Sequence, residues 1–207
     1  MSQYFKVHPI NPQRRLLAQA VQIIRNGGLI IYPTDSCYAF GWSIGDKAAL
    51  ERIRKIRATE RDHDFTLACR DLSDIATYAR LDNWAYRLLR SLTPGPYTFI
   101  LRATNEVPKR LQDPKRRSIG IRVPDHTIAQ ALLEELGEPL MSSTLLLPGD
   151  EVPLTEPDEI KARLEKLVDA IIDGGACGME PTSVLDLSNG DVSVLRQGKG
   201  DVSAFAS

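Results

Sequence analysis

Positive charges crowd one short stretch of the chain. Residues 52–61 contain five cations, among them Lys55 and Arg57, at the end of a segment whose apolar stripe predicts a helix. The helix dipole stabilises one or two cations at such an end, but not five. A point-charge lysine beside a forked arginine suits a triphosphate or an RNA backbone. Lys55 and Arg57 are therefore candidate phosphate ligands.

Another arginine lies at the end of a predicted strand. Arg122 comes after Ile119-Gly120-Ile121 and before Pro124, where a side chain is partly enclosed. An enclosed guanidinium needs a carboxylate or phosphate partner. Five more cations lie between residues 109 and 117, but loop cations usually serve solubility. Arg122 is the stronger candidate for an anion site.

Small hydroxyl side chains recur where predicted strands begin or end. Thr34 follows the strand at 29–32, and ligands of open α/β sheets lie outside such strand ends. The other candidates of this kind are Ser142, Thr144, Thr182 and Ser183, with Arg196 ending the last strand. Two interpretations stay open: a phosphate-binding site, or an Asx-type turn at residues 33–38 together with ordinary strand residues.

The sequence lacks several familiar sites. Neither a Walker loop nor a dinucleotide fingerprint occurs. The three cysteines and three histidines are scattered, so we expect no protein-bound metal and a reducing, cytoplasmic compartment. The N-terminus has no apolar signal core, and no apolar stretch approaches the ~20 residues of a membrane span. A membrane partner is not expected.

Charge is divided unevenly along the chain. The formal net charge is −1, yet residues 1–125 hold 21 Lys and Arg against 12 Asp and Glu, whereas residues 126–207 hold 5 against 15. The first part is thus +9 and the second −10. This favours an anionic partner if the fold keeps the two parts separate, and a mixed surface if it interleaves them.

Helix and strand patterns alternate from end to end. Asn11-Pro12 and Thr155 to Asp158 are predicted helix starts, and Asn189-Gly190 is a predicted hairpin turn. Further helices are predicted at 47–57, 71–79, 82–92 and 126–136, and strands at 29–32, 65–69, 97–102, 118–123, 140–144, 168–172, 182–187 and 192–196. These strands and six helices predict an α/β (α+β-like) fold in a single domain over residues 1–207, with a twisted, open, mixed sheet flanked by helices.

Several short segments follow one another along the chain in a fixed order. They are Gly27-Gly28, Pro33-Thr34-Asp35-Ser36-Cys37-Tyr38, Lys55-Ile56-Arg57, Thr93-Pro94-Gly95-Pro96-Tyr97-Thr98, Gly120-Ile121-Arg122-Val123-Pro124, Asp173-Gly174-Gly175, Pro181-Thr182-Ser183-Val184 and Leu195-Arg196-Gln197-Gly198. Taken in this order, they resemble the YrdC/YciO-like family, and specifically its YciO-type branch. The resemblance implies a YrdC/RibB-like fold with a positively charged concave face.

The resemblance also implies an activity. Members of the family condense L-threonine, bicarbonate and Mg-ATP into threonylcarbamoyl-adenylate, which serves the threonylcarbamoyladenosine modification of tRNA; others are described as double-stranded RNA binders. By motif, Thr34 would contact threonine, Lys55 and Arg57 the ATP phosphates, and Arg122 the adenylate or carbamoyl group. Ser142, Thr144, Thr182, Ser183 and Arg196 would line the nucleotide pocket.

Two departures from the synthase pattern bear on that activity. Thr144-Leu145-Leu146 stands where synthases carry a Ser-Ala-Asn-type motif, and Asp64 stands where they commonly carry a lysine. Both changes remove groups that would hold a nucleotide. Three functions therefore stay open: binding of ATP or the adenylate with weak or altered synthase or hydrolase chemistry, a non-enzymatic RNA-binding module for tRNA or double-stranded RNA, and a full synthase (a nucleotidyltransferase).

Overall fold

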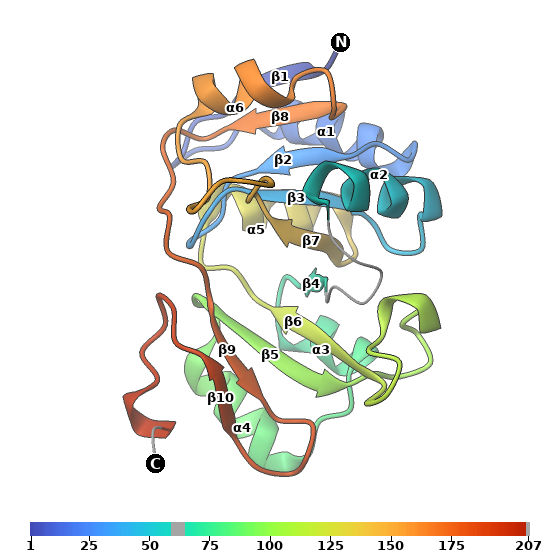
Figure 1. The fold of residues 1–207 in the computed structure, drawn as a ribbon, viewed down its shortest axis with the longest axis vertical. Coiled ribbons are helices and arrows are strands. Elements are labelled where there is room, and N and C mark those ends of the chain that lie inside the picture. Colours follow the sequence, from blue (N-terminus) through green and yellow to red (C-terminus); the bar gives the residue numbers. More distant parts are fainter. Residues whose placement is uncertain (59–64, 206–207) are drawn as a thin grey trace.

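One mixed sheet runs through the whole computed structural model, which describes residues 1–58 and 65–205. Its strands lie in the order β1-β8-β2-β3-β7-β4-β6-β5-β9-β10, and the sheet twists strongly from top to bottom of Figure 1. The strands are β1 (Gln3–Lys6), β2 (Ile30–Tyr32), β3 (Ala39–Ser43), β4 (Thr66–Ala68), β5 (Tyr97–Arg102), β6 (Ser118–Arg122), β7 (Leu140–Thr144), β8 (Ala170–Asp173), β9 (Ser183–Asp186) and β10 (Ser193–Arg196). The predicted mixed α/β fold is confirmed.

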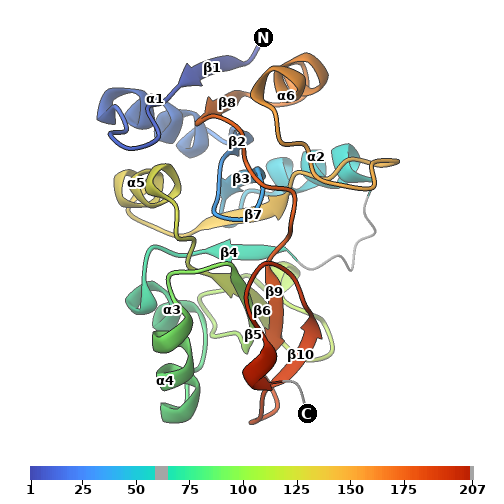
Figure 2. The same cartoon turned by 90° about the vertical axis from the view of Figure 1, so that its left-hand side faces the viewer.

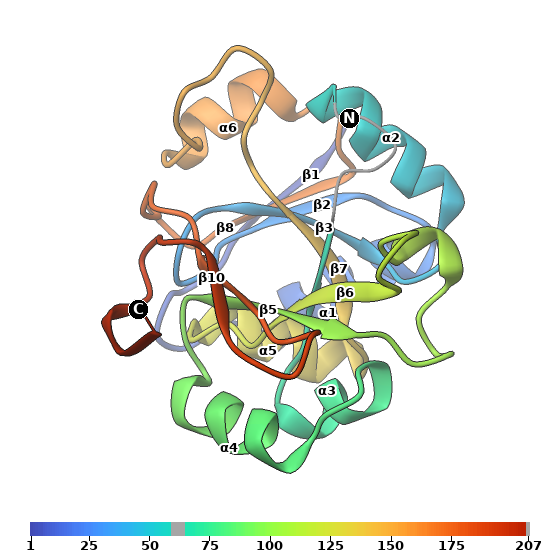
Figure 3. The same ribbon diagram turned by 60° about the horizontal axis from the view of Figure 1, so that its bottom comes forward.

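Six α-helices cover the two faces of this sheet within the described residues. They are α1 (Arg14–Arg25), α2 (Lys47–Arg57), α3 (Leu72–Tyr78), α4 (Asn83–Leu92), α5 (Thr127–Leu136) and α6 (Pro157–Leu164); the short 3-10 turns η1 (Lys109–Leu111) and η2 (Ser203–Phe205) complete the set. Figure 2 shows α1, α3, α4 and α5 on one side of the sheet and α2 and α6 on the other. Beyond β5 the sheet ends with β9 and β10, and Figure 3 shows the C-terminal segment beside β10.

The core consists of apolar side chains on both faces of the sheet. Leu17, Ile24 and Leu132, from α1 and α5, pack with Ile30 and Ile172 on one face. Trp42, Ile53 and Leu164 belong to a second cluster that includes residues of α2 and α6. The two helices α1 and α2 therefore follow from the helical spacing of their apolar residues, and burial of those stripes holds them on the sheet.

The predicted element boundaries need correction in four places. The strands β1 and β3 were not predicted: β1 is a short edge strand of mostly exposed residues, and β3 contains Gly41, which weakens strand propensity. A Cβ at Gly41 would lie 2.6 Å from Leu140 Cδ2 and 3.0 Å from the ring of Tyr32, so the two neighbouring strands leave little room for a side chain there. Two predicted caps are also wrong: α1 begins after Gln13, and α6 begins after Glu156 without a side-chain cap.

The basic and acidic parts of the sequence interleave in space. Strand β8 lies between β1 and β2, and β9 pairs with β5. Within the described part of the chain, three ion pairs join the two parts: Arg14 with Glu135, Arg52 with Asp169 and Arg116 with Asp186, at 3.0, 2.6 and 2.9 Å. The division of charge in the sequence therefore does not become a division of the molecule into a basic and an acidic half.

Candidate functional site

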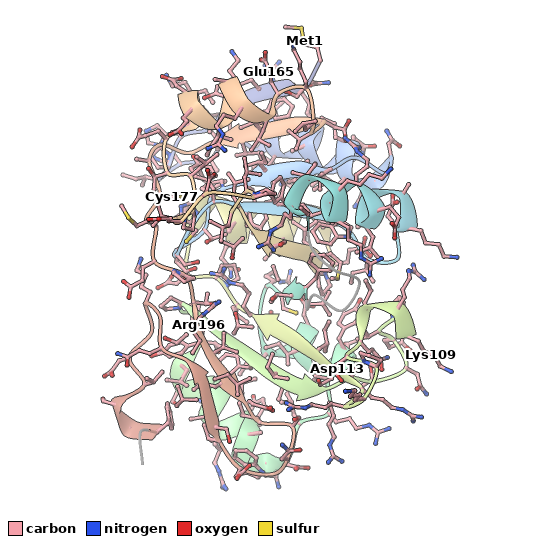
Figure 4. The ribbon with its side chains drawn as sticks, in the orientation of Figure 1. Met1, Lys109, Asp113, Glu165, Cys177 and Arg196 are labelled. Atoms are coloured by element: carbon pink, nitrogen blue, oxygen red, sulfur yellow. The ribbon has the colours of Figure 1, made fainter. Side chains whose placement is uncertain are left out.

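A cavity of about 470 Å³ lies where several strand ends meet. Of the nine residues predicted as ligands, six line it: Arg57, Arg122, Ser142, Thr144, Thr182 and Arg196. They come from α2, β6, β7, β10 and the residue that precedes β9. Figure 4 shows Arg196 beside β9 and β10, on the same side of the view as Cys177. The fold thus brings together residues up to 139 positions apart, Arg57 and Arg196.

Arg57 reaches the cavity from the last turn of α2. Asp46 caps the start of this helix by accepting a hydrogen bond from the Ala49 backbone N–H at 2.9 Å. At the other end, Arg57 Nη1 donates to Ser143 Oγ at 2.5 Å and Nε donates to the Leu146 carbonyl at 3.3 Å. Burial lowers the pKa of Arg57 from its ordinary value, because desolvation disfavours the charged form. The guanidinium is held against β7 at the cavity wall.

Arg122 ends β6 and is almost fully buried. Its Nη2 forms an ion pair with Asp35, and its Nη1 donates to Ser36 Oγ at 3.3 Å. The buried Nε has no hydrogen-bond partner among the residues that the structure describes. A buried donor left unpaired is costly, so this nitrogen is a place where a ligand oxygen would be stabilised. Arg122 also lines the cavity.

Arg196 and Thr182 form the third polar wall. Arg196 Nη2 and Nε donate to the Thr182 carbonyl at 2.8 and 3.1 Å, and the Thr182 hydroxyl lies 2.8 Å from that of Thr98. Partial desolvation lowers the pKa of Arg196. Thr182 directly precedes β9, which pairs in parallel with β5, the strand that contains Thr98. The Thr182 carbonyl thus orients the guanidinium of Arg196, and this arginine is exposed to solvent.

Three predicted site residues do not line the cavity. Thr34 is buried, and its hydroxyl donates to the Cys37 carbonyl at 2.5 Å, so it shapes the loop between β2 and β3. Ser183 is buried and donates to the Gly200 carbonyl at 2.5 Å, which fastens the C-terminal segment. Lys55 is exposed on α2. Ligand contacts of these three residues stay predictions.

Several lining residues were not predicted. Ser36, Thr98 and Ser143 add hydroxyls, and Thr98 has a signal in the sequence, since it interrupts an otherwise apolar buried strand. Val152, Met179 and Leu195 are apolar residues of the cavity wall that are 53%, 56% and 57% exposed. They have no common motif, because they come from two loops and a strand that only the fold brings together.

The residues of the two departures from the synthase pattern, Leu145-Leu146 and Asp64, are placed differently. Leu145 is fully buried in the core, whereas Leu146 lines the cavity. Of these two leucines, Leu146 is therefore the one whose side chain would contact a ligand in the cavity. Asp64 lies outside the described residues, so its predicted effect stays a prediction.

The cavity offers polar contacts without an activated thiol. Burial raises the pKa of Cys37, which lines the cavity, to about 11, so the thiol stays protonated near neutral pH. In residues 1–58 and 65–205, no group of three or more His, Cys, Asp or Glu side chains is placed to hold a metal ion. No helix in those ranges is long and apolar enough to cross a bilayer. The geometry therefore supports binding and charge stabilisation by arginines and hydroxyls.

Comparison with known proteins places this geometry in a family. The family model Sua5_yciO_yrdC, described as Telomere recombination, matches residues 22–198. The chain belongs to the Sua5/YciO/YrdC family. The predicted resemblance to its YciO-type branch is confirmed by YciO of Escherichia coli (strain K12), which is 57% identical over 205 residues, or 99% of this chain and 100% of that protein. The crystal structure of E. coli YciO matches with a TM-score of 0.95 and covers 100% of both chains.

Threonylcarbamoyl-AMP synthases are more distant members of the family. The synthase of Chromobacterium violaceum is 31% identical over 187 residues, which are 89% of this chain and 95% of that one. The crystal structure of P. abyssi Sua5 complexed with L-threonine has a TM-score of 0.85 at 24% identity, over 95% of this chain and 58% of that one. This last likeness shows the shared fold.

Proposed function

We propose that the protein binds threonylcarbamoyl-adenylate, or ATP together with L-threonine, in the 470 Å³ cavity and acts on that adenylate with weak or altered synthase or hydrolase chemistry. The observation that carries the proposal is the convergence of Arg57, Arg122 and Arg196 on one cavity that hydroxyls also line. Guanidinium groups and hydroxyls are suited to phosphate and carbonyl oxygens. The family relation to threonylcarbamoyl-AMP synthases supports the choice of this adenylate.

The same arginines and hydroxyls suit both the synthesis and the hydrolysis of the adenylate. In synthesis, the threonine amine and bicarbonate condense with loss of water to N-carboxythreonine. A carbamate oxygen of this compound then bonds to the α-phosphorus of ATP, the bond from that phosphorus to the oxygen that bridges it to the β-phosphorus breaks, and pyrophosphate leaves. In hydrolysis, water splits the mixed anhydride into AMP and N-carboxythreonine. Both transition states place negative charge around phosphorus or the carbonyl carbon, where fixed arginines stabilise it. Neither needs a covalent nucleophile.

Magnesium would enter with the triphosphate. Glu151 is the single carboxylate among the described cavity residues, and the hydroxyls around it are weak ligands for this ion on their own. A protein-built magnesium site does not fit these residues, whereas a cation chelated by nucleotide phosphates does. We therefore assign no step to the metal.

The cavity lacks an amide where Leu146 lies, and this gives a prediction. Leu146→Asn is expected to raise ATP affinity about two- to tenfold, because one added hydrogen bond contributes about 0.5–1.5 kcal/mol. The measurement is a calorimetric titration with ATP. Val152→Asn serves as the matched control, since Val152 also lines the cavity but is 53% exposed. Equal effects of the two substitutions, or none from Leu146→Asn, would contradict this assignment of Leu146.

Two assays on purified protein test the proposed function. One follows pyrophosphate release from Mg-ATP, L-threonine and bicarbonate, and the other follows AMP release from threonylcarbamoyl-adenylate above its spontaneous decay. Turnover in the second assay alone identifies a hydrolase, and turnover in the first identifies a synthase. Protein that neither turns over nor binds these compounds would overturn the proposal.

Binding to RNA is the competing function and is measured in the same preparation. Exposed cations on the 109–117 segment, on the opposite side of Figure 4 from Arg196, are its structural support. Phosphate-backbone binding would be lost steeply between about 50 and 300 mM salt, because it depends on counterion release. Retention of tRNA or double-stranded RNA with that salt dependence, without binding of ATP or adenylate, would favour RNA over the adenylate.

A further inference from the structure

A β-bulge brings an apolar side chain of β10 into the cavity wall beside Arg196. Val194 pairs with Leu185 on β9. Arg196 pairs with the adjacent Val184, so Leu195 is an extra residue that bulges out of the pairing. Consecutive residues of a regular strand point to opposite faces of the sheet. Leu195 and Arg196 nevertheless both line the cavity, and the bulge accounts for this.

Met179 comes from the segment that precedes β9, and this segment is hydrogen-bonded to the chain that follows β10. The Pro181 carbonyl accepts a hydrogen bond from the Lys199 backbone N–H at 2.9 Å. Met179 is exposed, as Leu195 is, and both side chains line the cavity. Pockets hold small molecules mainly through apolar contacts, so this methionine and this leucine suit a flat, apolar part of a ligand.

Glu151 adds a carboxylate to the same wall. Glu151 and Met179 line this cavity and also a second cavity of about 340 Å³, so the two residues lie where the cavities adjoin. Among the described residues that line the first cavity, Glu151 is the single carboxylate. An ionised carboxylate only accepts hydrogen bonds, so it favours a ligand group with an N–H and repels another anion.

We propose that Leu195 and Met179 seat the adenine base of the ligand and that Glu151 accepts a hydrogen bond from its 6-amino group. The inference rests on the proposed function and adds the orientation of the ligand and its base specificity. Adenine presents apolar faces, which pack on leucine and on the methionine sulfur, and an amino donor at its edge. Arg196, beside Leu195, then meets the phosphate end of the same nucleotide.

Charge disfavours the opposite orientation of an acyl adenylate. The threonyl end of threonylcarbamoyl-adenylate carries a free carboxylate, which Glu151 would repel, and a hydroxyl, which gains little from two apolar side chains. The adenine end carries no negative charge and has the donor that a carboxylate accepts. Glu151 thus selects which end of the ligand lies beside β10.

The first test compares ATP with the triphosphate of purine riboside, in which hydrogen replaces the 6-amino group. Wild-type protein is expected to bind ATP about five- to tenfold more tightly by calorimetry. Glu151→Ala removes the acceptor, so the two affinities should then agree within about twofold. Because the two nucleotides carry the same charge, their affinity ratio does not depend on the charge that the substitution removes.

Glu180→Ala is the matched control for Glu151→Ala. Glu180 is an exposed carboxylate next to Met179, and it lies outside the described residues that line either cavity. This variant should keep the five- to tenfold preference for ATP. Equal binding of the two nucleotides by the wild type, or a preference that Glu151→Ala retains, would overturn the inference.

The second test concerns the apolar seat. Leu195→Ser is expected to weaken the binding of both nucleotides about three- to tenfold and to leave their ratio unchanged, because both contain the purine ring. Leu195→Met should bind both within about twofold of wild type, since it restores a large apolar side chain. Leu167→Ser is the control: Leu167 is 47% exposed and lies away from the residues that line the cavity, so neither affinity should change.

Unchanged affinities in Leu195→Ser, or a loss in Leu195→Met equal to that in Leu195→Ser, would also overturn the inference. All these substitutions are at exposed residues, and unfolding curves check that each variant is folded. Wild-type protein that binds neither nucleotide would overturn the proposed function and this inference with it. Wild-type protein that binds threonylcarbamoyl-adenylate and both nucleotides, but without preference for ATP, would overturn the inference alone.

Discussion

Replacing Arg57 with glutamine is expected to weaken ATP binding by about 10- to 100-fold. A hydrogen bond from a charged group contributes about 1.5–3 kcal/mol, and each 1.4 kcal/mol is a tenfold change in the dissociation constant. Arg57 lines the cavity, and its contacts with Ser143 and the Leu146 carbonyl hold it there. Calorimetric titration of ATP into the variant and the wild type measures the effect.

The control for Arg57 lies on the same helix. Lys47 is exposed at the first turn of α2, about 15 Å from the last turn at 1.5 Å per residue. Lys47→Gln removes the same unit of charge and should change ATP affinity by less than about twofold, since exposed charges at that distance are screened by salt. Similar losses in the two variants would mean that overall charge, and not the cavity, attracts the nucleotide.

Arg122→Ala is expected to lower the free energy of unfolding by about 3–5 kcal/mol. The substitution leaves the Asp35 carboxylate buried without its cation, and breaking a buried ion pair from one side has this cost. The backbone N–H of Asp125 still contacts Asp35, which offsets only part of the loss. Urea denaturation followed by circular dichroism gives the value.

A second arginine–aspartate pair supplies the comparison. Arg116 is 56% exposed, although its partner Asp186 is buried, and Ser188 donates two further hydrogen bonds to that carboxylate. Arg116→Ala should therefore cost no more than about 1 kcal/mol. If Arg122→Ala lowers the free energy of unfolding by as little as Arg116→Ala, the Asp35–Arg122 pair does not stabilise the fold as its burial indicates.

The sequence predicted the parts of the fold that depend on local pattern. The stripe in α1, the strands β5 and β7 and the hairpin at Asn189-Gly190 follow from periodicity and turn chemistry, and the structure has them. The strand β1 was missed because it pairs with β8, whose residues follow more than 160 positions later, and β3 lies between its neighbour β2 and the distant β7. Local propensity carries no information on such pairing.

The candidate site, like the fold, could be predicted from local sequence pattern only in part. Hydroxyls and arginines at strand ends were predictable as a group, since strand ends of open sheets collect at one edge. The partner of Arg122 was not: a carboxylate or phosphate was expected, and only the fold shows that Asp35 provides it. Lys55 and Arg57 were predicted together, but residues two apart on a helix point in different directions, and only Arg57 lines the cavity.

A crystal structure of the protein soaked with ATP and L-threonine tests the central claim most directly. The account predicts nucleotide phosphate oxygens within about 3 Å of the guanidinium of Arg57 or Arg196, inside the cavity that Ser142 and Thr182 also line. An empty cavity at saturating nucleotide, or a nucleotide bound at another surface, would contradict it.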